Sequence, residues 1–469
     1  MPRVCTSWML NAVYAGLLAL LGPILIWRAV RHGRYRRGLR QKFAGALPIP
    51  ADHRPAVWFH AVSVGEVIQL RKIVAEFRTQ AADQYQIIVT TSTDTGFDLA
   101  RQHFPESTVT WFPLDFSWAV SRALHRLQPA LVVLMELELW PNFISACSRQ
   151  SIPVAVVNGR ISDRSFRGYS RIRRITAPML RRTRLIAAQT PQYAERLIAL
   201  GAPHSQVHVT GSVKFDGVVT DRRHPATQVL RELFGIRDTD IVFIAGSTQS
   251  PEEELALCAW QRLQRRWPAL RLILVPRHRE RFEEVAHLVQ DAGLPLIRRS
   301  MLPPGPSDRQ NSPGESRETP GSAAPAAGAT SGPEPVILLD TIGELGACWG
   351  LAEIAFVGGS FGSRGGQNMI EPAAYGAAVL FGPHTSNFRD VVATLQDAAA
   401  CLPLAQPEDL LPALEHLLTD PGRRQTLGRN AQQIVLTQQG ATSRTVSLLT
   451  NILDHRNSTG SSSDRFRIL

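Results

Sequence analysis

Short apolar runs rich in β-branched residues alternate with longer amphipathic stretches along most of the chain, and this alternation constrains the fold more than any other feature. Nearly continuous apolar runs are typical of parallel strands that helices cover on both faces. The pattern runs once between residues 56 and 211 and restarts after residue 240, so it predicts two doubly wound α/β domains. The expected strands are 56–62, 86–92, 108–114, 130–136, 154–159, 185–190 and 207–211, then 240–247, 270–276, 335–340, 353–359 and 377–383.

Two domains also suit a length of 469 residues, which exceeds what one hydrophobic core usually covers. Residues 303–335 contain thirteen prolines and glycines among thirty-three residues, so we expect a disordered insertion there. The expected organisation is an N-terminal anchor with its basic segment (1–45), a first domain (50–220), a second domain (226–455) and a tail (457–469).

The N-terminal region combines a long apolar run with a dense cluster of cations. Residues 10–30 could cross a hydrocarbon core of roughly 30 Å, and seven cations follow between Arg28 and Lys42. By the positive-inside rule, this order predicts a single membrane crossing with the rest of the chain in the cytoplasm. A signal peptide, a monotopic hairpin and a buried helix are the alternatives. Because the net charge of +11 is concentrated here, anionic lipids are expected as partners rather than nucleic acid.

The five cysteines are widely separated and form no CxxC pair, which argues against disulfide scaffolds and zinc sites and fits a reducing compartment. With no HExxH motif or His/Cys cluster, we expect no protein-held metal.

A glycine-rich turn between two expected strands, residues 358–366, is the first candidate site. Its amides could approach an anion, the helix expected near Asn368 would present the positive end of its dipole, and Glu371 could bind a ribose. The alternative is a βαβ connection in which glycine only supplies positive φ.

In the first domain, Ser63 and Glu66 have the spacing of a capping box, which alone explains both residues; a general base is the functional alternative for Glu66. Glu136 and Glu138 close the fourth strand and are expected to point the same way. Lys214 follows the seventh strand, where a solvated lysine is the simpler interpretation.

In the second domain, three more segments follow strands and suggest a phosphorylated ligand. Ser250 is the expected N-cap of a helix, with Pro251 and Glu253 in its first turn. Pro276 and Arg277 begin a basic segment that continues to Arg279, and residues 341–344 again have capping-box spacing.

Together these motifs resemble the 3-deoxy-D-manno-octulosonic acid (Kdo) transferases of lipopolysaccharide synthesis. The resemblance covers about residues 14–454 without the insertion. It rests on HAVSVGE, TSTDTGFDLA, MELELWPN, NGRISDRSF, TGSVKFD, AGSTQSPEEE, VPRHRERF, GELGACWGLAEIAFVGGSF and GGQNMIEPAAYG, in this order. It implies a GT-B fold with two domains facing a cleft, and an inverting transfer of Kdo from CMP-Kdo to a lipid A precursor (lipid IVA) at the inner membrane.

The resemblance also assigns roles to residues. Glu66 matches the catalytic base, and Glu136 and Lys214 match groups that stabilise the transition state. The segments that match the CMP-binding positions are Pro276–Arg277, Ile342–Gly343–Glu344 and Asn368–Met369–Ile370–Glu371.

Two positions depart from the family pattern, because Gln249 and Gln367 stand where members usually have histidine. Glutamine keeps a hydrogen-bond donor but carries no proton charge. A GT-B transferase for another nucleotide sugar, and a membrane-anchored binding protein without catalysis, are therefore the alternative functions.

Overall fold

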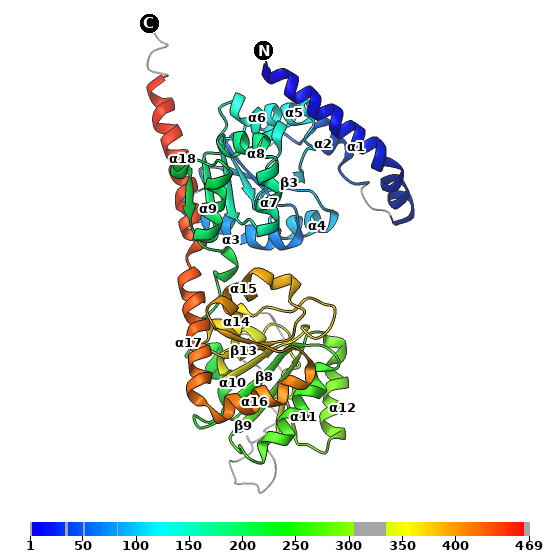
Figure 1. Cartoon of the computed structure of the whole chain (residues 1–469), viewed down its shortest axis with the longest axis vertical. Helices are drawn as coiled ribbons and strands as arrows, with labels where there is room; N and C mark the ends of the chain where they lie inside the picture. The colour runs from blue at the N-terminus through cyan, green and yellow to red at the C-terminus, as the bar shows by residue number, and fades with distance from the viewer. Residues whose placement is uncertain (1, 33–35, 50–51, 82, 304–333, 464–469) are drawn as a thin grey trace, which may run out of the picture. The chain divides into compact units, whose positions relative to one another are not determined.

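The computed structural model describes residues 2–32, 36–49, 52–81, 83–303 and 334–463, and these form two compact units (Figure 1). The first unit contains residues 1–216 and 438–469, and the second contains residues 217–437. The expected insertion lies almost entirely outside the described residues. The units differ from the expected domains at the carboxyl end, because the last helix belongs to the first unit.

The first unit is built on a parallel sheet with the strand order β3-β2-β1-β4-β5-β6-β7. Every neighbouring pair in it is parallel, with registers such as Val57 opposite Ile87 and Leu131. All seven strands expected from the apolar runs are present, which confirms the doubly wound prediction. The strands are β1 (Ala56–His60), β2 (Gln86–Thr91), β3 (Thr108–Trp111), β4 (Leu131–Met135), β5 (Val154–Gly159), β6 (Leu185–Ala188) and β7 (Val207–Val209).

Helices cover both faces of this sheet, as the apolar strands require. On one face Phe59 packs with Phe77 of α3, and on the other Trp58 packs with Phe143 of α6. The helices and 3₁₀ turns are α1 (Pro2–His32), α2 (Leu39–Ala44), α3 (Val64–Ala81), α4 (Asp94–His103), α5 (Ser117–Leu127), α6 (Pro141–Arg149), α7 (Asp163–Arg171), α8 (Arg173–Leu180), α9 (Pro191–Leu200), η1 (His204–Gln206), η2 (Val213–Phe215) and α18 (Ala441–Ser463).

Local sequence signals set the helix ends. At α9, the Thr190 hydroxyl accepts a hydrogen bond from the Tyr193 amide at 3.2 Å, Pro191 occupies the first turn, and Gly201 ends the helix with φ 116°.

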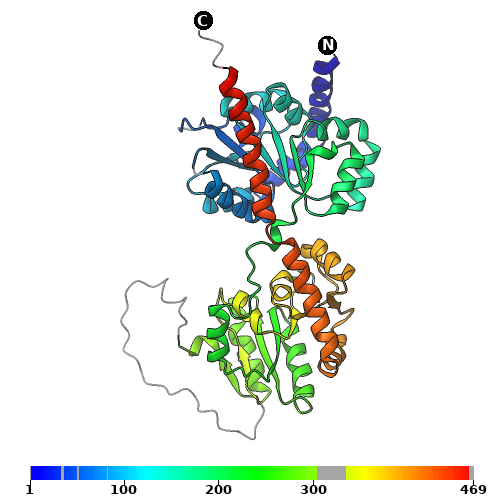
Figure 2. The ribbon, with the colours of Figure 1, turned by 90° about the vertical axis from the view of Figure 1, so that its left-hand side faces the viewer.

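The last helix, α18, returns to the first unit and packs on α3 (Figure 2). Val446, Leu449 and Leu453 enter the same core as Phe77. Asp216 holds the start of this helix by accepting hydrogen bonds from the Gly440 amide at 2.7 Å and the Thr442 amide at 2.6 Å. Apolar burial and this cap explain why the segment leaves the second unit.

The second unit repeats the architecture with the strand order β10-β11-β9-β8-β12-β13-β14. The five expected strands are present, and the structure adds β10 and β14, each of three residues at an edge of the sheet. These two strands are short and only partly buried, so their sequences lack an apolar run. The strands are β8 (Ile241–Thr248), β9 (Leu270–Pro276), β10 (Leu296–Arg298), β11 (Val336–Leu338), β12 (Ile354–Val357), β13 (Ala378–Phe381) and β14 (Cys401–Pro403).

The core of the second unit gathers Phe243, Leu272 and Phe356 of the sheet with Trp260 of α11 and Leu414 of α16. The Trp260 indole also donates a hydrogen bond to the Leu270 carbonyl at 3.0 Å. The helices are α10 (Pro225–Leu233), α11 (Glu252–Gln264), α12 (Phe282–Asp291), α13 (Leu345–Cys348), α14 (Ile370–Ala374), α15 (Arg389–Asp397), α16 (Leu410–Thr419) and α17 (Pro421–Gln438).

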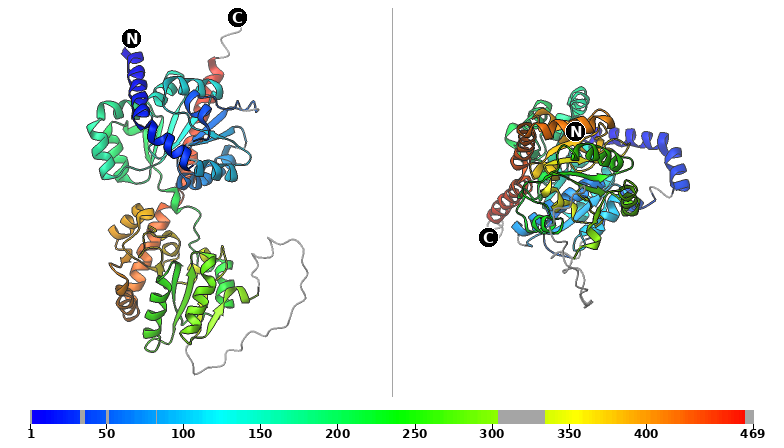
Figure 3. Two further views of the ribbon diagram at one scale, coloured as in Figure 1. Left: turned by 90° about the vertical axis from the view of Figure 1, so that its right-hand side faces the viewer. Right: turned by 90° about the horizontal axis from the view of Figure 1, so that it is seen from below.

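The apolar helix α1 lies against α5 of the first unit (Figure 3). Polar side chains attach it there. Asn11 is 5% exposed, and its amide group donates to the Ser117 hydroxyl at 2.7 Å. The Tyr14 hydroxyl donates to Asp115 at 3.0 Å. Asp115 also accepts the amides of Asn142 and Phe143 at 3.0 and 2.8 Å, so one carboxylate joins α1 to the start of α6.

This carboxylate predicts a pH dependence of stability. Burial raises the pKa of Asp115 from its ordinary value of 3.8 to about 6, although the amides of Asn142 and Phe143 and the Tyr14 hydroxyl oppose the shift. A carboxyl group with a raised folded pKa stabilises the fold below pH 4, and this stabilisation is lost as the pH rises through 6. It amounts to up to about 3 kcal/mol.

The unaltered protein loses this stabilisation as the pH rises, and Asp115→Asn does not. We therefore expect the unfolding midpoint of Asp115→Asn minus that of the unaltered protein to increase between pH 4 and pH 7. Thermal unfolding of the full chain over this range measures it. A difference that does not change with pH would contradict the prediction.

Candidate functional site

In each unit the strand order reverses at one point, and the candidate residues follow the strands that meet there. In the first unit β1 and β4 are neighbours at this point, and in the second unit β8 and β12 are. Ligands of open parallel sheets bind beyond the carboxyl ends of such strands. Glu66 and Glu136 follow β1 and β4, and the glycine-rich turn follows β12, so the fold places all three where a ligand site is expected.

Glu66 lies in the first turn of α3 and makes the capping contacts that its spacing predicts. Its carboxylate accepts hydrogen bonds from the Val62 amide and the Ser63 hydroxyl, both at 2.8 Å. The Glu66 amide in turn faces the Ser63 hydroxyl at 3.4 Å. A carboxylate has about four acceptor positions, so these two bonds leave capacity for a further donor. The cap does not exclude a role as a base.

The structure corrects the expected geometry of Glu136 and Glu138. Strand β4 ends at Met135, and Glu136 adopts a left-handed conformation with φ 54°. Neither carboxylate lies on a strand, so the strand geometry that would point both the same way does not apply. Glu136 is instead held by Arg160, whose Nε lies 3.0 Å from its carboxylate. The Trp140 indole donates to Glu138 at 3.1 Å.

Glu66, Glu136 and Glu138 nevertheless form one acidic cluster. Burial raises the pKa of Glu66, and the charge of Glu136 adds to this, against the hydrogen bonds from Val62 and Ser63. Burial also raises the pKa of Glu138, and the charges of Glu66 and Glu136 add to it. The raised pKa makes Glu66 a stronger base than an ordinary glutamate.

Lys214 lies on the turn η2, which packs against α3, the helix that carries Glu66. Lys72 of α3 donates to the carbonyl groups of Val213 and Asp216 at the two ends of this turn. The side chain of Asn158 accepts the Val213 amide at 3.3 Å and donates to Gln69 of α3 at 2.7 Å. Asn158 is fully buried with φ 54°. The sequence gives no signal of its contacts with η2 and α3, because an asparagine at the end of a strand is typical of a turn.

His60, at the end of β1, is a structural residue. Its ring is fully buried, stacks on Phe112 with 3.7 Å between ring centroids, and lies 3.1 Å from the Thr90 carbonyl oxygen. Burial lowers the pKa of His60 to about 3, so the ring is neutral at physiological pH.

The glycine-rich turn of the second unit does not present its first amides to a ligand. The carboxylate of Glu252, 2% exposed, accepts the amides of Gly359 at 2.7 Å, Ser360 at 3.0 Å and Phe361 at 3.1 Å. It also accepts the Gln249 amide at 2.9 Å. The expectation that these amides bind an external anion is therefore wrong, because an internal carboxylate occupies the anion-binding position.

The start of α11 also differs from the expectation. The helix begins at Glu252 with Pro251 as its N-cap, and Ser250 makes no capping hydrogen bond. Glu253, expected in the first turn as a capping residue, is buried and pairs with Arg281 of η3 (Arg279–Arg281) at 2.5 Å. The start of α11 is therefore held by the ion pair of Glu253 with Arg281 and by the contacts of Glu252.

The Asn368–Glu371 segment forms a local polar unit at the start of α14. The Asn368 side chain accepts the Ile370 amide at 3.1 Å and donates to Glu371 at 2.9 Å. Asn368 and Glu371 are half-buried, whereas Met369 and Ile370 are 0% and 2% exposed. Met369 and Ile370 therefore face the core and offer only their backbone to a ligand.

The other two donor-binding candidates lie at the same edge of the second sheet. Pro276 ends β9, and Arg277 follows as an exposed cation whose amide donates to the Thr248 carbonyl at 3.0 Å. In the third segment, Ile342 is 77% exposed and Gly343 has φ 95°. Glu344 contacts Arg299 at 2.9 Å and accepts from the Thr341 hydroxyl, so its charge is already compensated.

Gln249 and Gln367 meet at Gly359. A Cβ atom at this glycine would lie 3.1 Å from Nε2 of Gln367 and 3.6 Å from Nε2 of Gln249. The two departures from the family pattern are thus neighbours in space, which their separation in the sequence does not indicate.

Two parallel α/β sheets with sites at their carboxyl edges define a two-domain protein of the GT-B class. The same fold occurs in UDP-GlcNAc 2-epimerase from Neisseria meningitidis bound to UDP-GlcNAc, with a TM-score of 0.50 and 13% identity over 84% of this chain and 100% of that one. A family model described as "3-Deoxy-D-manno-octulosonic-acid transferase (kdotransferase)" matches residues 32–217.

Two relatives match nearly the whole chain. The 3-deoxy-D-manno-octulosonic acid transferase of Haemophilus influenzae is 32% identical over 94% of this chain and 98% of its own length. The 3-deoxy-D-manno-octulosonic acid transferase of Bordetella pertussis is also 32% identical, over 94% of this chain and 98% of its own length. The chain therefore belongs to the Kdo transferase family, and it is a glycosyltransferase.

Proposed function

We propose that this protein transfers Kdo from CMP-Kdo to a lipid A precursor, lipid IVA, with inversion at the anomeric carbon. The observation that carries the proposal is the acidic cluster of Glu66, Glu136 and Glu138 at the point where the first sheet reverses its strand order, in a chain of this family. Burial and a neighbouring charge make Glu66 suited to accept the proton of a sugar hydroxyl.

In the proposed reaction, the acceptor hydroxyl attacks the anomeric carbon of Kdo and gives its proton to Glu66. The bond from that carbon to the phosphate oxygen breaks, and CMP leaves with the electron pair. Positive charge grows on the sugar ring and negative charge on the leaving phosphate. Following the roles that the resemblance assigns, Glu136 would stabilise the first charge and Lys214 the second, without a metal ion.

The donor would be held at the edge of the second sheet by the residues the resemblance assigns. Arg277 supplies a cation, Asn368 and Glu371 supply polar side chains, and residues 342–344, 369 and 370 supply backbone groups. The Glu252 anchor supports this assignment, because it fixes the turn that leads into Asn368.

The pair at Gly359 leads to a prediction for donor binding. Gln367→His would introduce a side chain that titrates near pH 6.5. The protonated ring would strengthen binding of the anionic donor, so we expect KM for CMP-Kdo to fall about fivefold from pH 8 to pH 6, the difference between a neutral and a charged hydrogen bond. Gln367→Ala is the control, because its side chain does not titrate. If KM for CMP-Kdo changes equally with pH in both variants, the prediction is wrong.

We further propose that α1 holds the protein on the cytoplasmic side of the inner membrane. Among the described residues, α1 is the one helix long and apolar enough to cross a bilayer. Its Asn11 contacts the first unit, and after the helix Lys42 does so too, where the Leu114 amide donates to its carbonyl at 2.8 Å. Asn11 and Tyr14 lie inside the apolar run and contact the first unit, so this half of the helix favours a position along the membrane surface, the monotopic alternative, over a single crossing.

The test is to incubate the purified full chain with CMP-Kdo and lipid IVA and to analyse CMP and the lipid product. Kdo-bearing lipid together with stoichiometric CMP is the expected result. Release of CMP without a lipid product would refute the acceptor. Absence of CMP release from folded protein would refute the donor and favour another nucleotide sugar or a binding role.

A further inference from the structure

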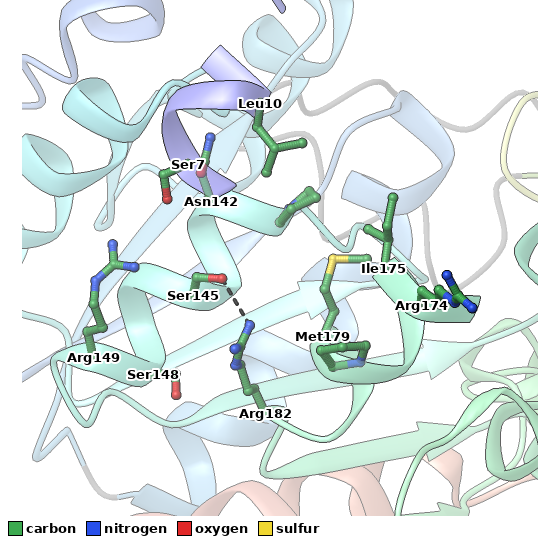
Figure 4. Close-up of a pocket in the computed structure, with 12 residues that line it drawn as sticks. Ser7, Leu10, Asn142, Ser145, Ser148, Arg149, Arg174, Ile175, Met179 and Arg182 are labelled. Carbon is green, nitrogen blue, oxygen red and sulfur yellow. Dashed lines mark hydrogen bonds between the residues drawn. The ribbon is translucent and has the colours of Figure 1, made fainter. Parts of the chain in front are cut away.

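A cavity of about 310 Å³ lies in the first unit between α1, α6 and α8 (Figure 4). Leu10 of α1 lies above it, Ser145 lies on α6, and Met179 lies on α8. Arg182, just after α8, donates to the Ser145 hydroxyl at 3.0 Å across the cavity. The cavity is therefore framed by secondary structure and by a hydrogen bond that joins two of its walls.

The cavity carries cations without matching anions, with Arg149 and Arg182 toward α6 and Arg174 beside Ile175 at the other end (Figure 4). Arg149, Arg174 and Arg182 all line it, and its lining includes no aspartate or glutamate. Within the described residues, none of the three arginines forms an ion pair with a carboxylate. The arginines toward α6, Arg149 and Arg182, favour a phosphate there, because guanidinium groups bind phosphate through paired hydrogen bonds.

A second polar feature points to a ligand with hydroxyl groups. Asn142 is 2% exposed and lines the cavity, and its Oδ1 has no hydrogen-bond partner among the residues described. An unpaired buried acceptor is unfavourable, so a donor supplied by a ligand would stabilise this wall.

Apolar side chains line the cavity near Arg174 and continue along the surface of α1 (Figure 4). Ile175 is 49% exposed at the cavity, and Trp8 and Met9, next to Leu10, are 68% and 67% exposed. Phosphate on one side and apolar chain on the other is the chemistry of a membrane lipid at the level of its headgroup.

We propose that this cavity binds the phosphate-bearing, hydroxylated headgroup of a membrane lipid. The arginines bind the phosphate, the headgroup hydroxyl meets the wall at Asn142, and the first part of the acyl chains lies along Ile175 and Leu10. The site is distinct from the sugar-transfer residues and does not depend on the transfer reaction. It would fix the depth of the first unit at the membrane through one bound lipid.

The experiment measures binding of soluble short-chain lipids to the full chain by calorimetry. Dihexanoyl phosphatidylglycerol has the proposed headgroup, glycerol 3-phosphate has a phosphate and two hydroxyls without acyl chains, and dihexanoyl phosphatidylcholine lacks both net charge and hydroxyls. We expect phosphatidylglycerol to bind at least about tenfold more tightly than either of the others. Glycerol 3-phosphate has no acyl chains, whose burial contributes about 0.8 kcal/mol per CH₂ group, and the choline cation of phosphatidylcholine is repelled by the arginines.

Variants then separate the parts of the site. Arg149→Ala/Arg182→Ala should weaken phosphatidylglycerol binding about tenfold or more. Arg122→Ala, which removes an exposed arginine on α5 outside the cavity, should change it less than about twofold. Ile175→Ser should weaken binding of the lipid and leave that of glycerol 3-phosphate unchanged.

Three results would overturn the proposal. The first is unchanged phosphatidylglycerol binding by the arginine variant. The second is glycerol 3-phosphate binding as tight as that of phosphatidylglycerol, which indicates a simple anion site, and the third is equally tight binding of phosphatidylcholine, which indicates an apolar surface. If Arg149→Ala/Arg182→Ala does not fold, Arg149→Ala/Arg174→Ala tests the same point with two exposed residues.

Discussion

Glu66→Ala is expected to lower the rate of Kdo transfer by about 10²–10⁴, the usual contribution of a positioned general base, while binding of CMP is retained. In the proposed reaction Glu66 acts on the acceptor, and the proposed donor residues belong to the second unit, so we expect CMP binding to be unchanged. The raised pKa of Glu66 also predicts a pH effect in the unaltered protein. As the pH falls, Glu66 gains a proton at a higher pH than an ordinary glutamate does, so the rate should begin to fall at that higher pH.

The capping contacts of Glu66 require a control, because their loss alone would cost about 1 kcal/mol of stability. Glu66→Gln keeps a side-chain oxygen for the Val62 amide and loses the basicity, so it should be as inactive as Glu66→Ala. Ser63→Ala removes the capping partner and leaves the carboxylate, so it should be destabilised and still active. If Glu66→Ala unfolds more easily and keeps its activity per folded molecule, Glu66 is a cap alone.

Glu252→Gln is expected to produce the largest loss of stability, about 3–5 kcal/mol. The buried carboxylate accepts four backbone amides, and a glutamine would turn an NH₂ group toward two of them. The turn between β12 and Asn368 would lose its anchor. We therefore expect a lower unfolding midpoint and weaker binding of CMP together.

The matched control is Glu254→Gln, an exposed position on the same helix that removes the same charge. It should leave both measurements unchanged. Equal effects of the two variants would show that the charge of α11, rather than the contact with the turn, is responsible. If Glu252→Gln is destabilised but binds CMP normally, the glycine-rich turn does not contribute to CMP binding.

The apolar runs predicted the two sheets well, because strands buried on both faces must be apolar throughout. They missed β10 and β14, since short strands at an edge need no such pattern. Spacing also predicted the contacts of Ser63 with Glu66, which depend only on neighbours in the chain. It failed at Ser250, since α11 begins one residue later than expected and Glu253 pairs with Arg281. It also failed at Glu136 and Glu138, since β4 ends before them and Glu136 pairs with Arg160.

The sequence by itself determined the fold class, the membership of the Kdo transferase family and the positions of the motifs after strands, because apolar periodicity and motif order are properties of the linear chain. Only the tertiary structure decided which groups act on one another. It brought Glu252 under the glycine-rich turn, placed Gln249 and Gln367 beside the same glycine and attached the first half of α1 to the first unit. The physical reason is that hydrogen bonds and charge interactions depend on distance in space, and the strand order that sets those distances leaves no local mark in the sequence.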